Sequence, residues 1–190
     1  MKTYTFHVSI PGTGRVWRKI EMKADQTLED LHFAIQRAYD WDADHLYSFF
    51  MSNQAWDEAS EYRLPDGYTP WGEPSWVEEE EEPPALSPEE QEAFLRELYG
   101  DADITLEEMK EDIRAFFEKL RKAPRPGDVR ETTVDELDLE EGQVFMYLFD
   151  YGDEWRFEVR VHAIDEEAPE DVEYPRIVQS VGEALEQYWS

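Results

Sequence analysis

The sequence predicts an α+β protein, in which a mixed β-sheet has one helix packed across a face. Residues 4–10 alternate apolar and polar side chains with the period of two of a half-buried strand. Aromatic and β-branched runs at 143–149 and 155–163 are also strand-like, and one early segment has helical spacing. Hydrophobic residues make up 41% of the chain and aromatic residues 14%, which is enough for a core. At 190 residues we expect a single domain.

The first 51 residues predict two strands, a helix and a third strand. A turn at 11–14, rich in glycine and proline, separates the alternating residues 4–10 from a second run at 16–22, which indicates a hairpin. Thr27 and Asp30 have the spacing of a helix capping box, and an apolar stripe continues to Tyr39. Residues 46–51 form a third apolar, strand-like run.

Residues 73–123 predict an acidic helical insertion into a core made of residues 1–72 and 124–190. Five consecutive glutamates at 78–82, followed by two prolines, are typical of a solvated linker. Ser87 and Thr105 each precede a capping pattern and an apolar stripe, so each predicts the start of a helix.

The last part predicts two strands, at 143–149 and 155–163, joined by the turn Asp150-Tyr151-Gly152-Asp153-Glu154-Trp155. We expect Gly152 to supply the positive φ that tight hairpins often need. Residues 174–188 are interpreted as a tail. The order ββαβ, insertion, ββ is typical of a β-grasp-like arrangement.

The charge and composition of the chain disfavour or exclude several classes of function. The net charge of −29 comes from 47 acidic and 18 basic residues, and it disfavours direct nucleic-acid binding. The main cluster of cations is expected on the solvent face of a strand: Arg15, Arg18, Lys19 and Lys23. The absence of cysteine excludes disulfides and thiolate chemistry. No signal-like or membrane-spanning apolar stretch is present, so we expect a cytoplasmic protein without membrane contact.

Known catalytic motifs are missing from the sequence: it has no phosphate loop, dinucleotide fingerprint, nucleophile elbow or His-Glu-x-x-His pair. We therefore assign no catalytic residue, metal ligand or cofactor. If the chain folds back after the helix, His32 and His45 would meet Asp150 or Asp153 as a two-histidine, one-carboxylate site. The favoured interpretation is architectural, with a core-bonded helix histidine and turn carboxylates that bond their own backbone.

Two sequence blocks carry a family resemblance. The first runs from Val16-Trp17-Arg18-Lys19-Ile20 through Leu31-His32, Trp41 and His45-Leu46 to Phe49, and the second contains Phe149 to Trp155, Tyr174-Pro175-Arg176 and Gly182-Glu183-Ala184. With these residues the chain resembles the plasmid pRiA4b ORF-3-like protein family.

The resemblance implies a compact α+β sheet domain without an established biochemical activity. Its motif residues are our candidate binding residues: His32, Trp41, His45, Asp150, Asp153 and Trp155. One position departs from the family pattern, because Phe157 stands where members often have histidine. This departure counts against a shared metal or catalytic cluster.

The preferred functional hypothesis is a non-enzymatic binding module for a protein or peptide with a basic surface. Contact would be made through the acidic helices or an exposed aromatic face. One alternative is a metal-dependent or hydrolase-like enzyme that uses the His/Asp cluster. Another is a DNA-related protein associated with mobile elements, which would need a positively charged surface around residues 15–23.

Overall fold

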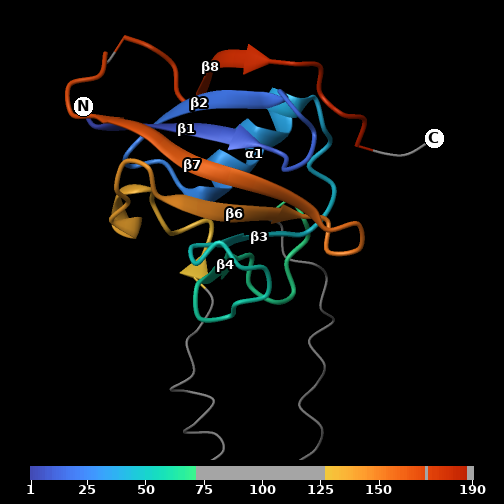
Figure 1. Ribbon diagram of the computed structural model, residues 1–190. Coiled ribbons are helices and arrows are strands. Elements are labelled where there is room, and N and C mark those ends of the chain that lie inside the picture. Colours follow the sequence, from blue (N-terminus) through green and yellow to red (C-terminus); the bar gives the residue numbers. More distant parts are fainter. Residues whose placement is uncertain (72–126, 170, 188–190) are drawn as a thin grey trace, which may run out of the picture. The chain divides into compact units, whose positions relative to one another are not determined.

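The computed structural model describes residues 1–71, 127–169 and 171–187. Within these ranges eight strands form one sheet in the order β5-β4-β3-β6-β7-β1-β2-β8 (Figure 1). Their bounds are β1 Thr3–Ser9, β2 Trp17–Lys23, β3 Tyr47–Phe50, β4 Glu61–Arg63, β5 Gly127–Asp128, β6 Val144–Phe149, β7 Trp155–Asp165 and β8 Arg176–Val181. Strands β4 and β5 are parallel and the other neighbouring pairs are antiparallel, so the sheet is mixed, as predicted.

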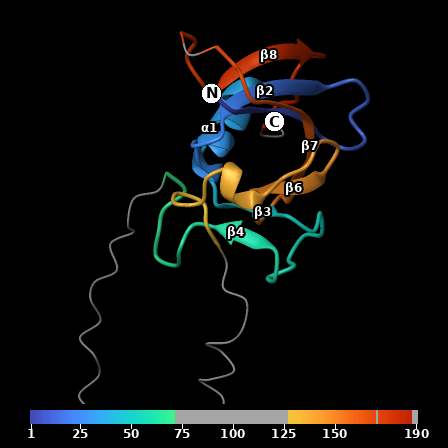
Figure 2. The ribbon, with the colours of Figure 1, turned by 90° about the vertical axis from the view of Figure 1, so that its left-hand side faces the viewer.

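Helix α1 (Leu28–Tyr39) lies against the inner side of the sheet, which curls around it (Figure 2). The predicted capping box is present: the Thr27 side chain accepts from the Asp30 N–H, and the Asp30 carboxylate accepts from the Thr27 N–H. Asp40 ends the helix in the left-handed conformation, with φ of 58°. In the described ranges no helix has the length and apolar character needed to cross a membrane.

The centre of the sheet follows the alternation in the sequence. On β1, Phe6 and Val8 are fully buried, whereas His7 between them faces outward and is only partly covered. Phe6 pairs in register with Ile20 of β2 and Val161 of β7, which are buried as well. These side chains, together with the apolar face of α1, form the core.

Three strands and one side chain differ from the sequence predictions. Strands β4, β5 and β8 were not predicted; β8 lies in the segment interpreted as a tail and pairs with β2. Arg18, expected on the solvent face, points inward with 5% exposure, because its guanidinium donates to the carbonyls of Ala38, Trp17 and Val181. The small η1 turn (Asp135–Leu137) precedes β6. The predicted helical insertion 73–123 lies outside the described residues.

Candidate functional site

The turn between β6 and β7 is held by the side chain of Asp150. Its Oδ1 accepts hydrogen bonds from the backbone N–H of Gly152 at 2.9 Å and of Asp153 at 3.4 Å. The expectation for Gly152 was wrong: the left-handed residues of this turn are Asp150, with φ of 56°, and Glu154, with φ of 51°. A Cβ at Gly152 would lie 3.2 Å from Asp150 Oδ1, so this glycine leaves room for the carboxylate that organises the turn.

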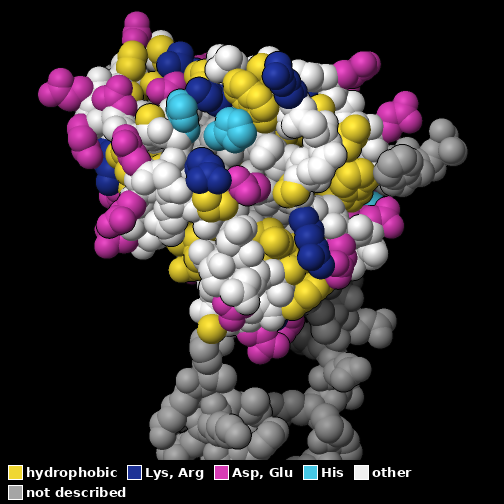
Figure 3. Space-filling model, in the orientation of Figure 1, with side chains coloured by type: hydrophobic (Ala, Val, Ile, Leu, Met, Phe, Trp, Pro, Cys, Tyr) yellow, Lys and Arg dark blue, Asp and Glu magenta, His cyan; other side chains and the backbone are white. Residues whose placement is uncertain are grey.

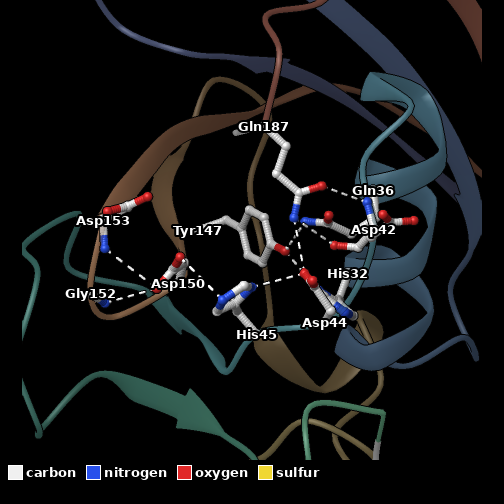
Figure 4. A network of polar contacts seen from close by, with 10 residues as sticks. All are labelled: His32, Gln36, Asp42, Asp44, His45, Tyr147, Asp150, Gly152, Asp153 and Gln187. Carbon is white, nitrogen blue, oxygen red and sulfur yellow. Dashed lines mark hydrogen bonds and ion pairs between the residues drawn. The ribbon is translucent and has the colours of Figure 1, made fainter. Parts of the chain in front are cut away.

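His45 lies between two carboxylates that come from different parts of the chain. Its Nδ1 is 2.8 Å from Asp44 Oδ1, and its Nε2 is 3.5 Å from Asp150 Oδ2 (Figure 4). The Gln187 amide donates to Asp44 Oδ1 and to the Asp42 carbonyl, which ties this loop to the C-terminal segment. The structure therefore brings together two of the predicted residues, His45 and Asp150.

His32 belongs to the core, as the architectural interpretation expected. Its side chain has no exposed surface, its ring stacks on Tyr47, and Nδ1 lies 2.6 Å from the Tyr147 hydroxyl. Gln36 donates to the same hydroxyl, so the hydroxyl hydrogen is directed to His32. Burial lowers the pKa of His32 to about 3, and the imidazole is neutral at physiological pH.

The metal-site alternative needs His32, His45, Asp150 and Asp153 to converge, and the structure does not bring these four side chains together. His32 bonds within the core, whereas His45 contacts Asp150 at the surface (Figure 4). Only the backbone N–H of Asp153 bonds to Asp150. Among the residues that the structure describes, no group of three histidine, aspartate or glutamate side chains is placed to hold a metal ion.

Trp41 belongs to the core, and Trp155 packs against it. Their ring centroids are 4.8 Å apart in an edge-to-face arrangement, and the Trp41 indole donates to the carbonyl of Leu185. Phe157, at the position of the family histidine, is buried with its centroid 5.4 Å from that of Trp41. These contacts give the tryptophans a structural role and make Phe157 a core residue.

A surface pocket of about 340 Å³ opens beside the turn. It is lined by Asp44, His45, Leu46, Tyr68, Pro70, Asp150, Tyr151 and Gly152. Its surface is mainly apolar, and the lining residues include two aspartates, Asp44 and Asp150. Most of these residues were not predicted as site residues, because Tyr68 and Pro70 follow the short strand β4, which has no clear alternation in the sequence.

Trp56 extends this surface beyond the pocket and was also missed. Its side chain is 48% exposed. Its backbone has φ of 66°, a conformation that bulky residues seldom adopt. The indole N–H donates to Glu154 at 3.1 Å, and the ring meets that of Tyr151 edge-on at 5.2 Å. The only signal in the sequence was a tryptophan in a polar loop. Tyr151 links Trp56 to the pocket.

Comparisons with known proteins agree with this fold. A solved structure, described as a protein of unknown function, MM3350 from Methanosarcina mazei Go1, has a TM-score of 0.55 and 22% sequence identity. The match covers 97% of this chain and 72% of that one, and at this identity it shows the fold alone. No curated protein matches. The family model described as plasmid pRiA4b ORF-3-like protein matches residues 2–187, and the chain belongs to this family.

Proposed function

We propose that the chain is a non-enzymatic binding module that recognises a basic protein or peptide through the pocket beside the β6–β7 turn. The observation that carries this proposal is a mainly apolar pocket whose lining residues include two aspartates, Asp44 and Asp150. In this proposal a lysine or arginine side chain of the partner enters the pocket. The predicted binding residues His45 and Asp150 would contact it directly.

The charges in the pocket favour a cation. Asp44 and Asp150 share one imidazole, so the three groups keep a negative excess even when His45 is protonated. The Asp150 side chain is only 16% exposed, which keeps its carboxylate partly out of bulk water. Partial desolvation strengthens the attraction between this carboxylate and an arriving ammonium or guanidinium.

The apolar walls of the pocket suit the hydrocarbon stem of a lysine or arginine side chain. Lysine and arginine have long apolar stems, which pack on surfaces such as those of Leu46 and Pro70. The rings of Tyr68 and Tyr151 also line the pocket and can attract a cation through their faces. Tyr68 already does this within the chain, since the Arg130 guanidinium lies 3.9 Å from its centroid.

The whole chain supports the same partner. A net charge of −29 attracts basic partners over long distances and raises their rate of association. We propose the acidic insertion predicted at 73–123 as a second contact region. We also propose a β-grasp-like description for the core, which the helix across the curled sheet supports. The enzyme alternative is weaker because its four residues do not converge.

Calorimetric titration with short arginine- and lysine-containing peptides tests the proposal. Asp44→Asn and Asp150→Asn remove charge but keep an oxygen that accepts the hydrogen bonds described above. Each should weaken binding about tenfold, because a hydrogen bond to a charged group contributes about 1.5–3 kcal/mol. The matched control is Asp171→Asn, an exposed carboxylate outside the pocket, which should change the affinity by less than about twofold.

Asp153 and His32 were predicted as binding residues; His32 lies in the core, and a variant tests the part of Asp153. Asp153 lies in the turn but does not line the pocket, so Asp153→Asn should behave like the Asp171 control. An equal loss of affinity in all four aspartate variants would mean that only overall charge matters, and the pocket proposal would then be wrong.

A further inference from the structure

A second surface, separate from the pocket, carries the opposite charge. Strands β1, β2 and β7 lie side by side, and their outward-facing residues include four nitrogen-bearing side chains, which we call the cationic face: His7, Lys19, Arg160 and His162. His7 is the register partner of both Lys19 and Arg160. Figure 3 shows histidine side chains gathered with lysine and arginine over these strands.

Lys19 is bonded differently from several other cations in the described ranges. Lys2, Arg130 and Arg176, for example, form ion pairs with carboxylates at 2.6 Å. The Lys19 ammonium instead lies 2.8 Å from Nε2 of His162, and its other contact is the Trp17 ring, whose centroid is 5.8 Å away. No ion pair between Lys19 and a carboxylate occurs in the part of the chain that the structure describes.

The charged groups that act on His7 are mostly basic. The pKa of His7 is lowered, first by burial and then by the charges of Lys19, His162 and Arg160; only Glu158 opposes them. Glu158 itself is paired with Arg160 at 2.9 Å. Basic groups therefore gather around His7 although the chain carries a net charge of −29.

Ammonium and guanidinium groups and protonated imidazoles donate hydrogen bonds and accept none, which is the chemistry that binds an oxyanion. We propose that the cationic face binds the phosphoryl group of a small soluble ligand. A long polyanion is disfavoured because the rest of this acidic chain would repel it. The Trp17 ring, centred 4.9 Å from that of His7, supports the imidazole from one side. This inference does not depend on the pocket function.

Affinity for the anion should rise as the pH falls. The groups that face the anion are His7 on β1, Lys19 on β2, and Arg160 and His162 on β7, together with Glu158. Glu21 of β2 is held by Arg176 of β8 at 2.6 Å. Because a bound dianion favours the protonated imidazole of His7, whose pKa is otherwise lowered by burial and by its basic neighbours, proton uptake by His7 and anion binding reinforce each other.

Imidazole NMR signals of the full chain, followed during titration with inorganic phosphate and with sulfate, test the proposal. Sulfate remains a dianion from pH 5.5 to 7.5, so any pH dependence in that titration comes from the protein. We expect saturable shifts at His7 and His162, with at least threefold tighter sulfate binding at pH 5.5 than at 7.5. Lys19→Gln should weaken binding about tenfold. Lys23→Gln, a change of equal charge on the same strand, should alter it less than twofold.

Three outcomes would overturn the assignment. The first is a linear, unsaturated response that chloride at equal ionic strength reproduces. The second is an equal effect of the Lys19 and Lys23 substitutions, which would show that only net charge matters. The third concerns the source of the phosphoryl group: a phosphoserine peptide that binds at least tenfold tighter than inorganic phosphate would replace the small ligand with a protein partner.

Discussion

The imidazole of His32 lies inside the core, stacked on Tyr47 and bonded through Nδ1 to the Tyr147 hydroxyl. Its Nε2 has no hydrogen-bond partner among the described residues, which adds to the cost of placing it there. Because a buried imidazolium would lose its hydration without gaining a counter-charge, the neutral form is strongly favoured. At this position a histidine from the family motif serves packing.

The free energy of unfolding should therefore depend on His32 below pH 6.5. The unfolded chain takes up a proton near the ordinary pKa of 6.5, whereas the folded chain does so only near 3. The contribution of the neutral His32 to the free energy of unfolding is fully present above about pH 6.5. It falls as the pH drops towards 3, by up to about 1.4 kcal/mol per pH unit. Urea denaturation at pH 7, 6 and 5 should show that the free energy of unfolding falls less with decreasing pH in His32→Phe than in the parent chain. Parallel curves for the two proteins would contradict this account.

At the scale of elements, the connections at strand ends decide how loops are placed. Gly182 follows β8 with φ of 76°, and a Cβ there would lie 2.6 Å from the Arg15 carbonyl oxygen. Gly152 is not left-handed, and its Cβ would meet only the Asp150 side chain. The two glycines therefore serve different purposes, although both belong to the family motifs.

Alanine substitutions separate these purposes. Gly182→Ala should destabilise the fold by about 1–3 kcal/mol, because it combines a strained φ with a clash against backbone. Gly152→Ala should destabilise the fold by less than half of that amount, since the Asp150 side-chain oxygen can shift by a few tenths of an ångström. Thermal unfolding of both variants and the parent chain gives the comparison. A larger cost at Gly152 would show that the turn is more constrained than its φ values indicate.

The sequence predicted the elements whose patterns are strong and local. The alternation of residues 4–10 and the capping box at Thr27 each led to an element that the structure contains. Strand β8 was missed because most of its residues are exposed and it has no buried alternation to reveal it. Strands β4 and β5 have three and two residues, too few to show a period.

The candidate site was predicted only in part for a similar reason. The family motif pointed to His45 and Asp150, which do meet at the pocket. Tyr68 and Trp56 come from irregular segments, and only long-range packing brings them to the turn. The inward orientation of Arg18 was likewise hidden, because a guanidinium is buried only when carbonyls from distant elements surround it.

At the scale of the whole molecule, net charge affects both stability and recognition. With 47 acidic and 18 basic residues, the folded chain repels itself, and compaction brings like charges closer. Raising NaCl from 50 mM to 500 mM should therefore raise the melting temperature, since the screening length falls from about 14 Å to about 4 Å. A melting temperature that falls with salt would mean that the ion pairs outweigh the self-repulsion.

In the proposed function, the pocket beside the β6–β7 turn holds a basic side chain of the partner. The most direct measurement is a map of backbone amide NMR shifts during titration with a short arginine-containing peptide at physiological salt. We expect saturable shifts concentrated at Leu46, Tyr151 and Gly152, and their loss in Asp150→Asn. Shifts spread over the acidic surface without saturation, or a localised response elsewhere that leaves these amides unchanged, would contradict it.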